Sequence, residues 1–315
     1  MPTVRANLLK LFGLVTVLVL VAVGCGGGGG ASGKVDLSGA DITVGSKEFT
    51  ESLVLGYIAI QLLENAGATV TDQTRLAGSV AARQALESGE IDAYWDYTGT
   101  AWIIYLGHTQ PIDGSQKQYE AVAKEDLKKN DIKWLPPAPA NNTYALAVRK
   151  EAYDDLGVKE LSDFEQLINE NPEEASLCGA TEFLNRDDGL PGLEETYGYE
   201  FPRDQLVKIE LGLIPKAIDQ GDRCNFGEVF ATDARIEGLG LKVIKDDKGF
   251  FPVYNPSLNV SKQVYEDYPQ IEKIFAPVSK KLTTETLLNL NAQVDVQGRL
   301  PEDVAEKWLS DNGFI

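Results

Sequence analysis

The alternation of strand-like and helix-like segments over residues 42–97 most strongly limits what this chain can fold into. Residues 42–44 form a short β-branched segment that is typical of a strand. Leu53, Tyr57 and Ile60 follow with helical spacing. "ATVTDQTRL" then alternates like a strand, and "IDAYWDY" reads as another strand after a second helical segment. The order strand, helix, strand, helix, strand predicts an α/β protein whose parallel sheet is covered by helices.

A second unit of the same kind follows a proline-rich segment, "LPPAPA". "YALAVRK", "SLCGATEFL" and "FGEVFATD" read as strands, with helical segments among them. After Gly249, "FFPVYNPSLNVSK" indicates a second crossing, and the rest of the chain is helical. We therefore predict one lobe from residues 41–143 and 250–315 and another from 144–249. Two crossings would join the lobes and leave a ligand cleft between them.

Both units are predicted to end a strand with an aromatic residue. "GEIDAYWDYTGT" and "GDRCNFGEVFATD" each run from Gly and an acid through a strand to an aromatic residue and Thr, so Tyr97 and Phe230 end their strands. Ligands of open α/β sheets bind at the carboxyl ends of strands. Rings around a small cavity hold a quaternary ammonium group by cation–π attraction, worth ~0.5–2 kcal/mol per contact. Asp96 either pairs with a backbone turn or adds negative potential near the cleft.

The N-terminus predicts export. Arg5 and Lys10 precede the apolar run "LFGLVTVLVLVAVG", which ends before Cys25 and is shorter than the ~20 residues of a membrane span. Residues 1–24 are therefore predicted to be a signal peptide. "VAVGC" resembles a bacterial lipobox, which predicts that Cys25 is lipidated and that residues 25–40 are a Gly-rich tether. The alternative is an uncleaved anchor helix, and both place the folded part at the cell membrane on the extracytoplasmic side.

Charge and motifs exclude several classes of function. The formal charge of −19 argues against a nucleic-acid partner, because phosphate binding needs a basic face. The sequence has no G-x-S-x-G, HExxH or phosphate-loop motif, and its single histidine is His108. We therefore predict no enzymatic activity, with a surface-anchored hydrolase as a remote alternative.

Two cysteines lie in the predicted second lobe. Cys178 and Cys224 either form a disulfide, as an even pair in an oxidising compartment suggests, or remain two separate buried thiols. No metal-ligand spacing is visible, so we predict no metal and no cofactor. Nothing in the sequence indicates an oligomer, and we expect a monomer.

The sequence resembles a known family over about residues 41–315. The motifs that carry the resemblance are "ITVGSKEFTES", "ALESGEIDAYWDYTGT", "NNTYALAV", "FLNRDDGLPGLEETYG" and "DVAEKWLSDNGF". They are similar to the substrate-binding components of osmoprotectant ABC importers, which bind glycine betaine, choline or carnitine. The resemblance implies a two-lobed periplasmic-binding-protein fold of type II that closes on its ligand. It also implies a membrane permease and an ATPase as partners.

The resemblance also implies the residues of the site. The family's aromatic box falls on Tyr97, Tyr144, Phe230 and Tyr254, and its contacts to a betaine carboxylate fall on Lys47, Thr100 and Arg186. Family members usually carry Tyr where Phe230 stands, and Phe keeps the ring but loses the hydroxyl. Because choline has no carboxylate, a Lys and an Arg at the ligand favour a betaine.

Other interpretations of these residues stay open. Carnitine, ergothioneine or another ligand would fit if Phe230 reshapes the box. The tyrosines could pack at the hinge, Phe230 could belong to the core, and Lys47 could be a solvated loop charge. Arg186 could form a salt bridge with Asp187 or Asp188.

Overall fold

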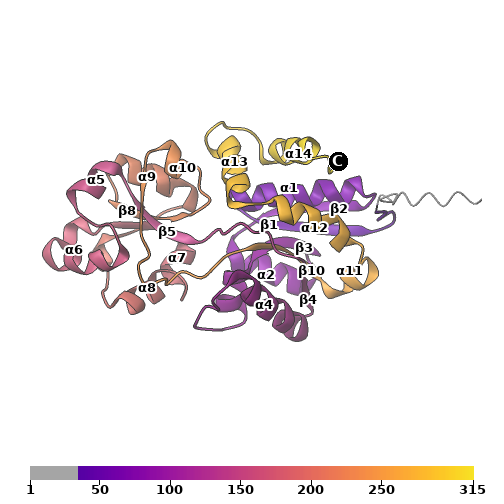
Figure 1. Cartoon of the computed structure of the whole chain (residues 1–315), viewed down its shortest axis with the longest axis horizontal. Helices are drawn as coiled ribbons and strands as arrows, with labels where there is room; N and C mark the ends of the chain where they lie inside the picture. Colours follow the sequence, from indigo (N-terminus) through magenta and orange to yellow (C-terminus); the bar gives the residue numbers. More distant parts are fainter. Residues whose placement is uncertain (1–34) are drawn as a thin grey trace, which may run out of the picture. The chain divides into compact units, whose positions relative to one another are not determined.

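The computed structural model describes residues 35–315 (Figure 1). The predicted signal peptide, Cys25 and the glycine run lie outside the described residues. Within residues 35–315, no helix is long and apolar enough to span a membrane. The fold contains helices and two separate sheets, so the predicted α/β class is confirmed.

The first sheet has five strands in the order β2-β1-β3-β10-β4. Their bounds are β1 Asp41–Lys47, β2 Thr69–Leu76, β3 Ala93–Tyr97, β4 Ile132–Trp134 and β10 Pro256–Ser261. β1 pairs in parallel with β2 and β3, as predicted. The sheet also contains a strand outside that predicted pattern, because β10 runs antiparallel to both β3 and β4. β10 follows the second crossing in the chain and lies between β3 and β4, which come much earlier in the sequence.

The second sheet also has five strands, in the order β7-β6-β8-β5-β9. Their bounds are β5 Tyr144–Val148, β6 Leu177–Gly179, β7 Leu206–Lys208, β8 Phe226–Phe230 and β9 Lys242–Ile244. β6 is parallel to β7 and β8, whereas β5 is antiparallel to β8 and β9. All of this sheet therefore comes from one continuous stretch of chain, between the two segments that build the first sheet.

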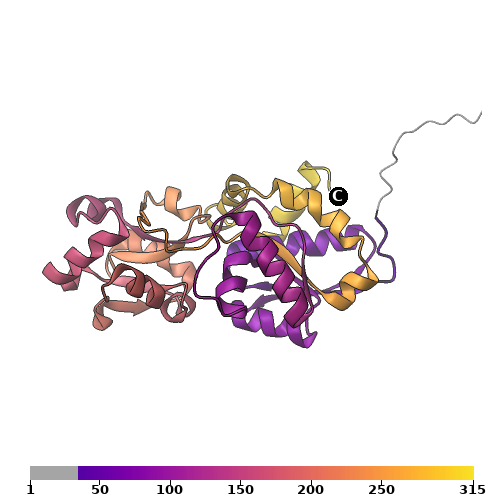
Figure 2. The same cartoon turned by 60° about the horizontal axis from the view of Figure 1, so that its bottom comes forward.

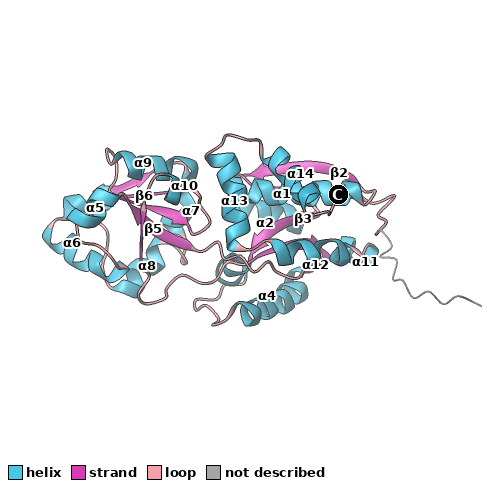
Figure 3. Cartoon of the chain, turned by 45° about the horizontal axis from the view of Figure 1, so that its top comes forward, coloured by secondary structure: helices cyan, strands magenta, loops and turns pink. Residues whose placement is uncertain are grey.

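Helices flank the strands of both sheets (Figure 3). Those beside the first sheet are α1 Thr50–Asn65, α2 Gly78–Ser88, α3 Thr98–Thr100, α4 Ser115–Asn130, α11 Lys262–Asp267, α12 Ile271–Lys281, α13 Thr284–Asp295 and α14 Pro301–Asp311. Those beside the second are α5 Lys150–Asp155, α6 Phe164–Glu170, α7 Thr181–Asn185, α8 Leu190–Tyr197, α9 Ile214–Gln220 and α10 Arg235–Gly238. α1 is apolar on most sides because it lies between β1 and the C-terminal helices α13 and α14.

Each sheet has its own apolar core. Trp95 on β3 is fully buried against Phe275 of α12, and their ring centroids are 6.2 Å apart. In the second core, Phe164 packs edge-on against Phe226 at 4.7 Å. Fully burying one such side chain stabilises the fold by ~1.5–3 kcal/mol. The buried apolar clusters beside each sheet give it a rigid platform for the residues at its strand ends.

The chain crosses between the sheets twice, over residues 135–143 and 245–255 (Figures 1 and 2). The crossings lie side by side, because the Asn142 N–H donates to the Tyr254 carbonyl at 3.0 Å. The Tyr254 N–H in turn donates to the Asn141 side-chain oxygen at 2.8 Å.

A disulfide joins Cys178 of β6 to Cys224, which lies two residues before β8. It is buried among Ile214 and Ile218 of α9. The bond therefore ties the central strands of the second sheet together.

Candidate functional site

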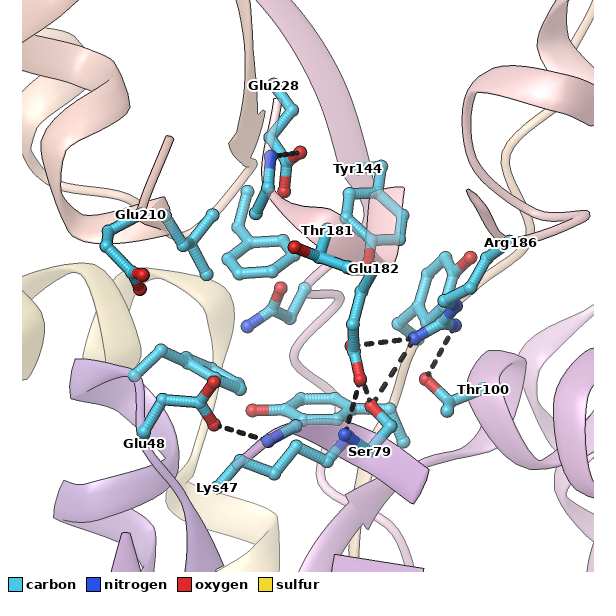
Figure 4. A pocket seen from close by; sticks show the side chains of 18 of the residues that line it. Lys47, Glu48, Ser79, Thr100, Tyr144, Thr181, Glu182, Arg186, Glu210 and Glu228 are labelled. Atoms are coloured by element: carbon cyan, nitrogen blue, oxygen red, sulfur yellow. Dashed lines mark hydrogen bonds and ion pairs between the residues drawn. The ribbon is translucent and has the colours of Figure 1, made fainter. Parts of the chain in front are cut away.

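A cavity of about 420 Å³ lies between the two sheets and is lined by residues from both. All of the residues predicted for the ligand line it, namely Lys47, Tyr97, Thr100, Tyr144, Arg186, Phe230 and Tyr254. Four of them, from both sides of the cavity, are labelled in Figure 4. The geometry brings these side chains to one place, whereas their role as ligand contacts stays a prediction.

Strand ends explain why the residues meet. Lys47 ends β1, Tyr97 ends β3 and Phe230 ends β8, and all three lie where the strands approach the cavity. Tyr144 begins β5, but β5 runs antiparallel to β8, so Tyr144 is the direct partner of Phe230 in the ladder. Because β5 is antiparallel to β8, the first residue of β5 lies at the same edge of the sheet as the last residue of β8.

The rings form a connected wall. Tyr144 lies 5.1 Å from Phe230 and 5.7 Å from Tyr254 between ring centroids. Phe49 extends the wall, because its ring lies 5.3 Å from Phe230 and 6.1 Å from Tyr97. These separations are those of favourable aromatic pairs. Phe49 lines the cavity but was missed from the sequence, although its place two residues after Lys47 pointed to the same edge.

Buried carboxylates hold two of the tyrosine hydroxyls. The Tyr97 hydroxyl donates to Glu51 at 2.8 Å, and the Tyr254 hydroxyl donates to Asp188 at 2.6 Å. Burial raises the pKa of both phenols, and the neighbouring carboxylate raises it further. Both tyrosines therefore remain protonated, and each ring is fixed at its hydroxyl end.

Lys47 has an internal partner. Its ammonium lies 2.7 Å from the Asp96 carboxylate, and both side chains are buried. Asp96 also accepts hydrogen bonds from the Tyr94 hydroxyl and from the Tyr97 N–H, the latter at 2.8 Å. This pairing explains the acid within the aromatic stretch: Asp96 neutralises a lysine beside the box. The interpretation of Lys47 as a solvated loop charge is wrong.

Arg186 is also paired. Its Nε and Nη2 donate to the two oxygens of Asp188 at 2.8 and 2.6 Å. This is one of the alternatives that the sequence left open. Two further contacts reach across the cavity: Nη2 lies 3.4 Å from the Thr100 hydroxyl, and Nη1 lies 3.3 Å from the Ser79 hydroxyl (Figure 4). Arg186 thus links the two sides of the cavity while its charge is compensated by Asp188.

Carboxylates that the sequence analysis missed also line the cavity. They are Glu48, Glu182, Glu210 and Glu228. Glu228 lies on β8, where burial raises its pKa to about 8 and a hydrogen bond from the Ala180 N–H partly offsets the shift. A Glu inside the apolar strand "FGEVF" was the available signal for it. The cavity therefore carries four carboxyl groups beside the cationic side chains of Lys47, Arg186 and Lys208.

Comparison with known proteins identifies the family. The family model for the substrate binding domain of the ABC-type glycine betaine transport system matches residues 40–311. The chain belongs to this family. It is thus a substrate-binding protein of ABC-type glycine betaine transport, and the family is one of transport proteins rather than enzymes.

The chain aligns over most of its own length with several known proteins. A glycine-betaine-binding protein of Pseudomonas aeruginosa is 34% identical over 281 residues, which are 87% of this chain and 88% of the relative. An ergothioneine transport permease and binding protein, EgtU of Helicobacter pylori, is 32% identical over 87% of this chain but only 48% of its own length. The solved structure of apo YehZ from Escherichia coli superposes with a TM-score of 0.63 at 33% identity, covering 87% of this chain and 99% of that one. The predicted two-lobed periplasmic-binding-protein fold is confirmed by this match.

Proposed function

We propose that this protein captures glycine betaine, or a betaine with the same trimethylammonium group, in the cavity between the two sheets. The observation that carries the proposal is the wall of rings from Phe49, Tyr97, Tyr144, Phe230 and Tyr254 around that cavity. A quaternary cation cannot lose a proton, so a site of π faces holds it at little desolvation cost. The names of the family and of the Pseudomonas relative support the same ligand.

The ligand then passes to the permease and ATPase of an importer, and the protein works as a monomer on the extracytoplasmic side of the membrane. Cys25 anchors it there through a lipid, and the glycine run after Cys25 gives the folded part its reach. Lobe closure about the two crossings captures the ligand, because the ligand binds the closed state better than the open one.

A larger betaine is the second candidate. The cavity of about 420 Å³ exceeds what so small a molecule as glycine betaine fills. Glu48, an exposed carboxylate that lines the same cavity, is placed to accept a hydrogen bond from a donor group on a longer ligand. Ergothioneine and carnitine both extend a trimethylammonium group in this way, and EgtU is named for the first.

Calorimetric titration with glycine betaine, choline, carnitine and ergothioneine tests the proposal. We expect a betaine to bind more tightly than choline, and Tyr97→Ala to weaken that binding ~2–30-fold, the equivalent of ~0.5–2 kcal/mol. Phe314→Ala is the control, because Phe314 packs against Trp308 and does not line the cavity. Equal affinities of the wild type and Tyr97→Ala would remove Tyr97 from the box. If none of these ligands binds, the ligand class is wrong.

A further inference from the structure

One carboxylate spans the cavity from one side to the other. Glu182 lies on α7, beside the second sheet, whereas Ser79 lies at the start of α2, beside the first. The Ser79 N–H donates to one oxygen of Glu182, and the Ser79 hydroxyl donates to the other at 3.1 Å. Figure 4 shows the Glu182 side chain reaching down to Ser79 between Tyr144 and Arg186.

The backbone at this point is shaped for a close approach. Gly78, just before Ser79, has a φ of +79°, a conformation that favours glycine. A Cβ at Gly78 would lie only 2.6 Å from the carboxylate oxygen of Glu182. Any side chain there would push the carboxylate away from the start of α2.

The groups that hold Glu182 form a carboxylate-binding set. An N–H group in the first turn of a helix and a serine hydroxyl both donate to anions. The third member is Arg186, whose Nη1 lies 3.2 Å from the Glu182 oxygen that also accepts from the Ser79 hydroxyl. The cavity lining includes Ser79, Thr100 and Arg186. The carboxylate of a bound betaine would need these same donors.

Arg186 has no unused charge to offer a further anion. Asp188 occupies one edge of its guanidinium and Glu182 contacts the other. A ligand carboxylate entering beside them would meet two anions and one shared cation, and like charges at such range repel. Either the ligand carries no carboxylate, or the Glu182 side chain moves away from Ser79 and Arg186 when the ligand binds.

We propose that Glu182 is a specificity-determining residue that competes with the carboxylate of the ligand. Without ligand it occupies the donors on Ser79 and Arg186 and holds the two sides of the cavity together. A betaine must displace it, whereas choline binds with Glu182 in place. The Glu182 side chain is 36% exposed, so water can solvate the carboxylate once it is displaced. This inference rests on the proposed function, because it assumes a trimethylammonium ligand.

Relative affinities test the competition. Glu182→Gln removes the charge while keeping the shape, and Glu210→Gln is the matched control, since Glu210 lines the same cavity. Calorimetry should show glycine betaine binding about tenfold more tightly to Glu182→Gln than to the wild type, as expected for hydrogen bonds to a charged group. Choline is a cation that binds with Glu182 in place, so it should bind no more tightly to Glu182→Gln than to the wild type. An unchanged ratio of the two affinities, weaker betaine binding, or the same gain in Glu210→Gln would overturn the proposal.

Small-angle scattering without ligand separates this inference from the proposed function. Glu182→Ala should increase the radius of gyration, because the contact across the cavity is lost, and Glu210→Ala should leave it unchanged. If neither ligand binds any of the proteins, the proposed ligand class fails and scattering decides alone. An increase in the radius of gyration of Glu182→Ala alone then supports the proposal that Glu182 holds the two sides of the cavity together. An unchanged radius overturns that proposal.

Discussion

The hydroxyl of Tyr97 donates a 2.8 Å hydrogen bond to the carboxylate of Glu51, which lies buried behind the aromatic wall. Asn142 and Asn291 donate to the same carboxylate at 2.6 and 3.1 Å. Burial raises the pKa of Glu51, and these hydrogen bonds partly offset the shift. All three partners are donors, so the arrangement suits the ionised carboxylate. Its negative charge lies behind the ring that is proposed to face the cation.

Glu51→Gln should therefore weaken the binding of glycine betaine but not that of an isostere that lacks the cation. We expect a loss of ~2–10-fold for the betaine, the scale of a cation–π contact. tert-Butylacetate keeps the shape and the carboxylate but is an anion without the cation, so its affinity should not fall. Calorimetric titration of both ligands measures the difference. An equal loss for both would mean that Glu51 acts only by positioning Tyr97.

Phe49→Ala should weaken glycine betaine binding ~2–30-fold, because Phe49 joins Tyr97 to Phe230 in the wall. Phe314→Ala removes the same ring outside the cavity and serves as the matched control. Equal affinities of the two variants would restrict the box to the residues found from the sequence.

Replacing Lys47 should cost stability rather than only affinity. Lys47→Met leaves Asp96 buried without its cation, and breaking such a pair typically costs ~3–5 kcal/mol. Lys47→Met with Asp96→Asn should recover most of the loss, since no uncompensated charge remains. Urea unfolding of both variants measures the free energies. A neutral effect of Lys47→Met would show that the pair contributes little to the fold.

Glu228 should make stability fall as the pH rises. Its pKa is raised by burial from 4.5 in the unfolded chain to about 8 in the fold, so between these values the folded state binds more protons. Its contribution is fully present below about pH 4.5 and is lost through about pH 8, with an upper limit of about 5 kcal/mol. Glu228→Gln should flatten the urea-unfolding free energy over this window. Parallel pH profiles of the wild type and the variant would contradict the shift.

The sequence predicted most clearly those features that depend on local pattern. Tyr97 and Phe230 could be placed because each ends an alternating strand, and both lie at the predicted strand ends. The direction of β10 could not be predicted, because "PSLNVS" gives no local sign of the strands it will join.

Side-chain partners were hardest to predict, because they depend on how distant segments meet. Lys47 and Asp96 are 49 positions apart, and only the pairing of β1 with β3 makes them neighbours. Glu182 reaches Ser79 over an interval of 103 residues. Neither contact leaves a periodic trace in the sequence. The residues proposed to face the ligand were therefore easier to predict from the sequence than the carboxylates that pair with Lys47 and Arg186.

The position of β10 between β3 and β4 has a consequence for how the chain is made. β4 pairs only with β10 in its sheet, so the first half of the structure stays incomplete until residues 256–261 have emerged. The strands of the second sheet all lie before residue 245 and can pair earlier, with Cys178 already beside Cys224. We expect a chain that stops at residue 250 to resist proteolysis over 144–249 and to be cut between residues 41 and 134. If the chain is exported from its N-terminus, the second sheet can thus form first. The first sheet, which contains the N-terminal strands, is completed only when β10 has emerged.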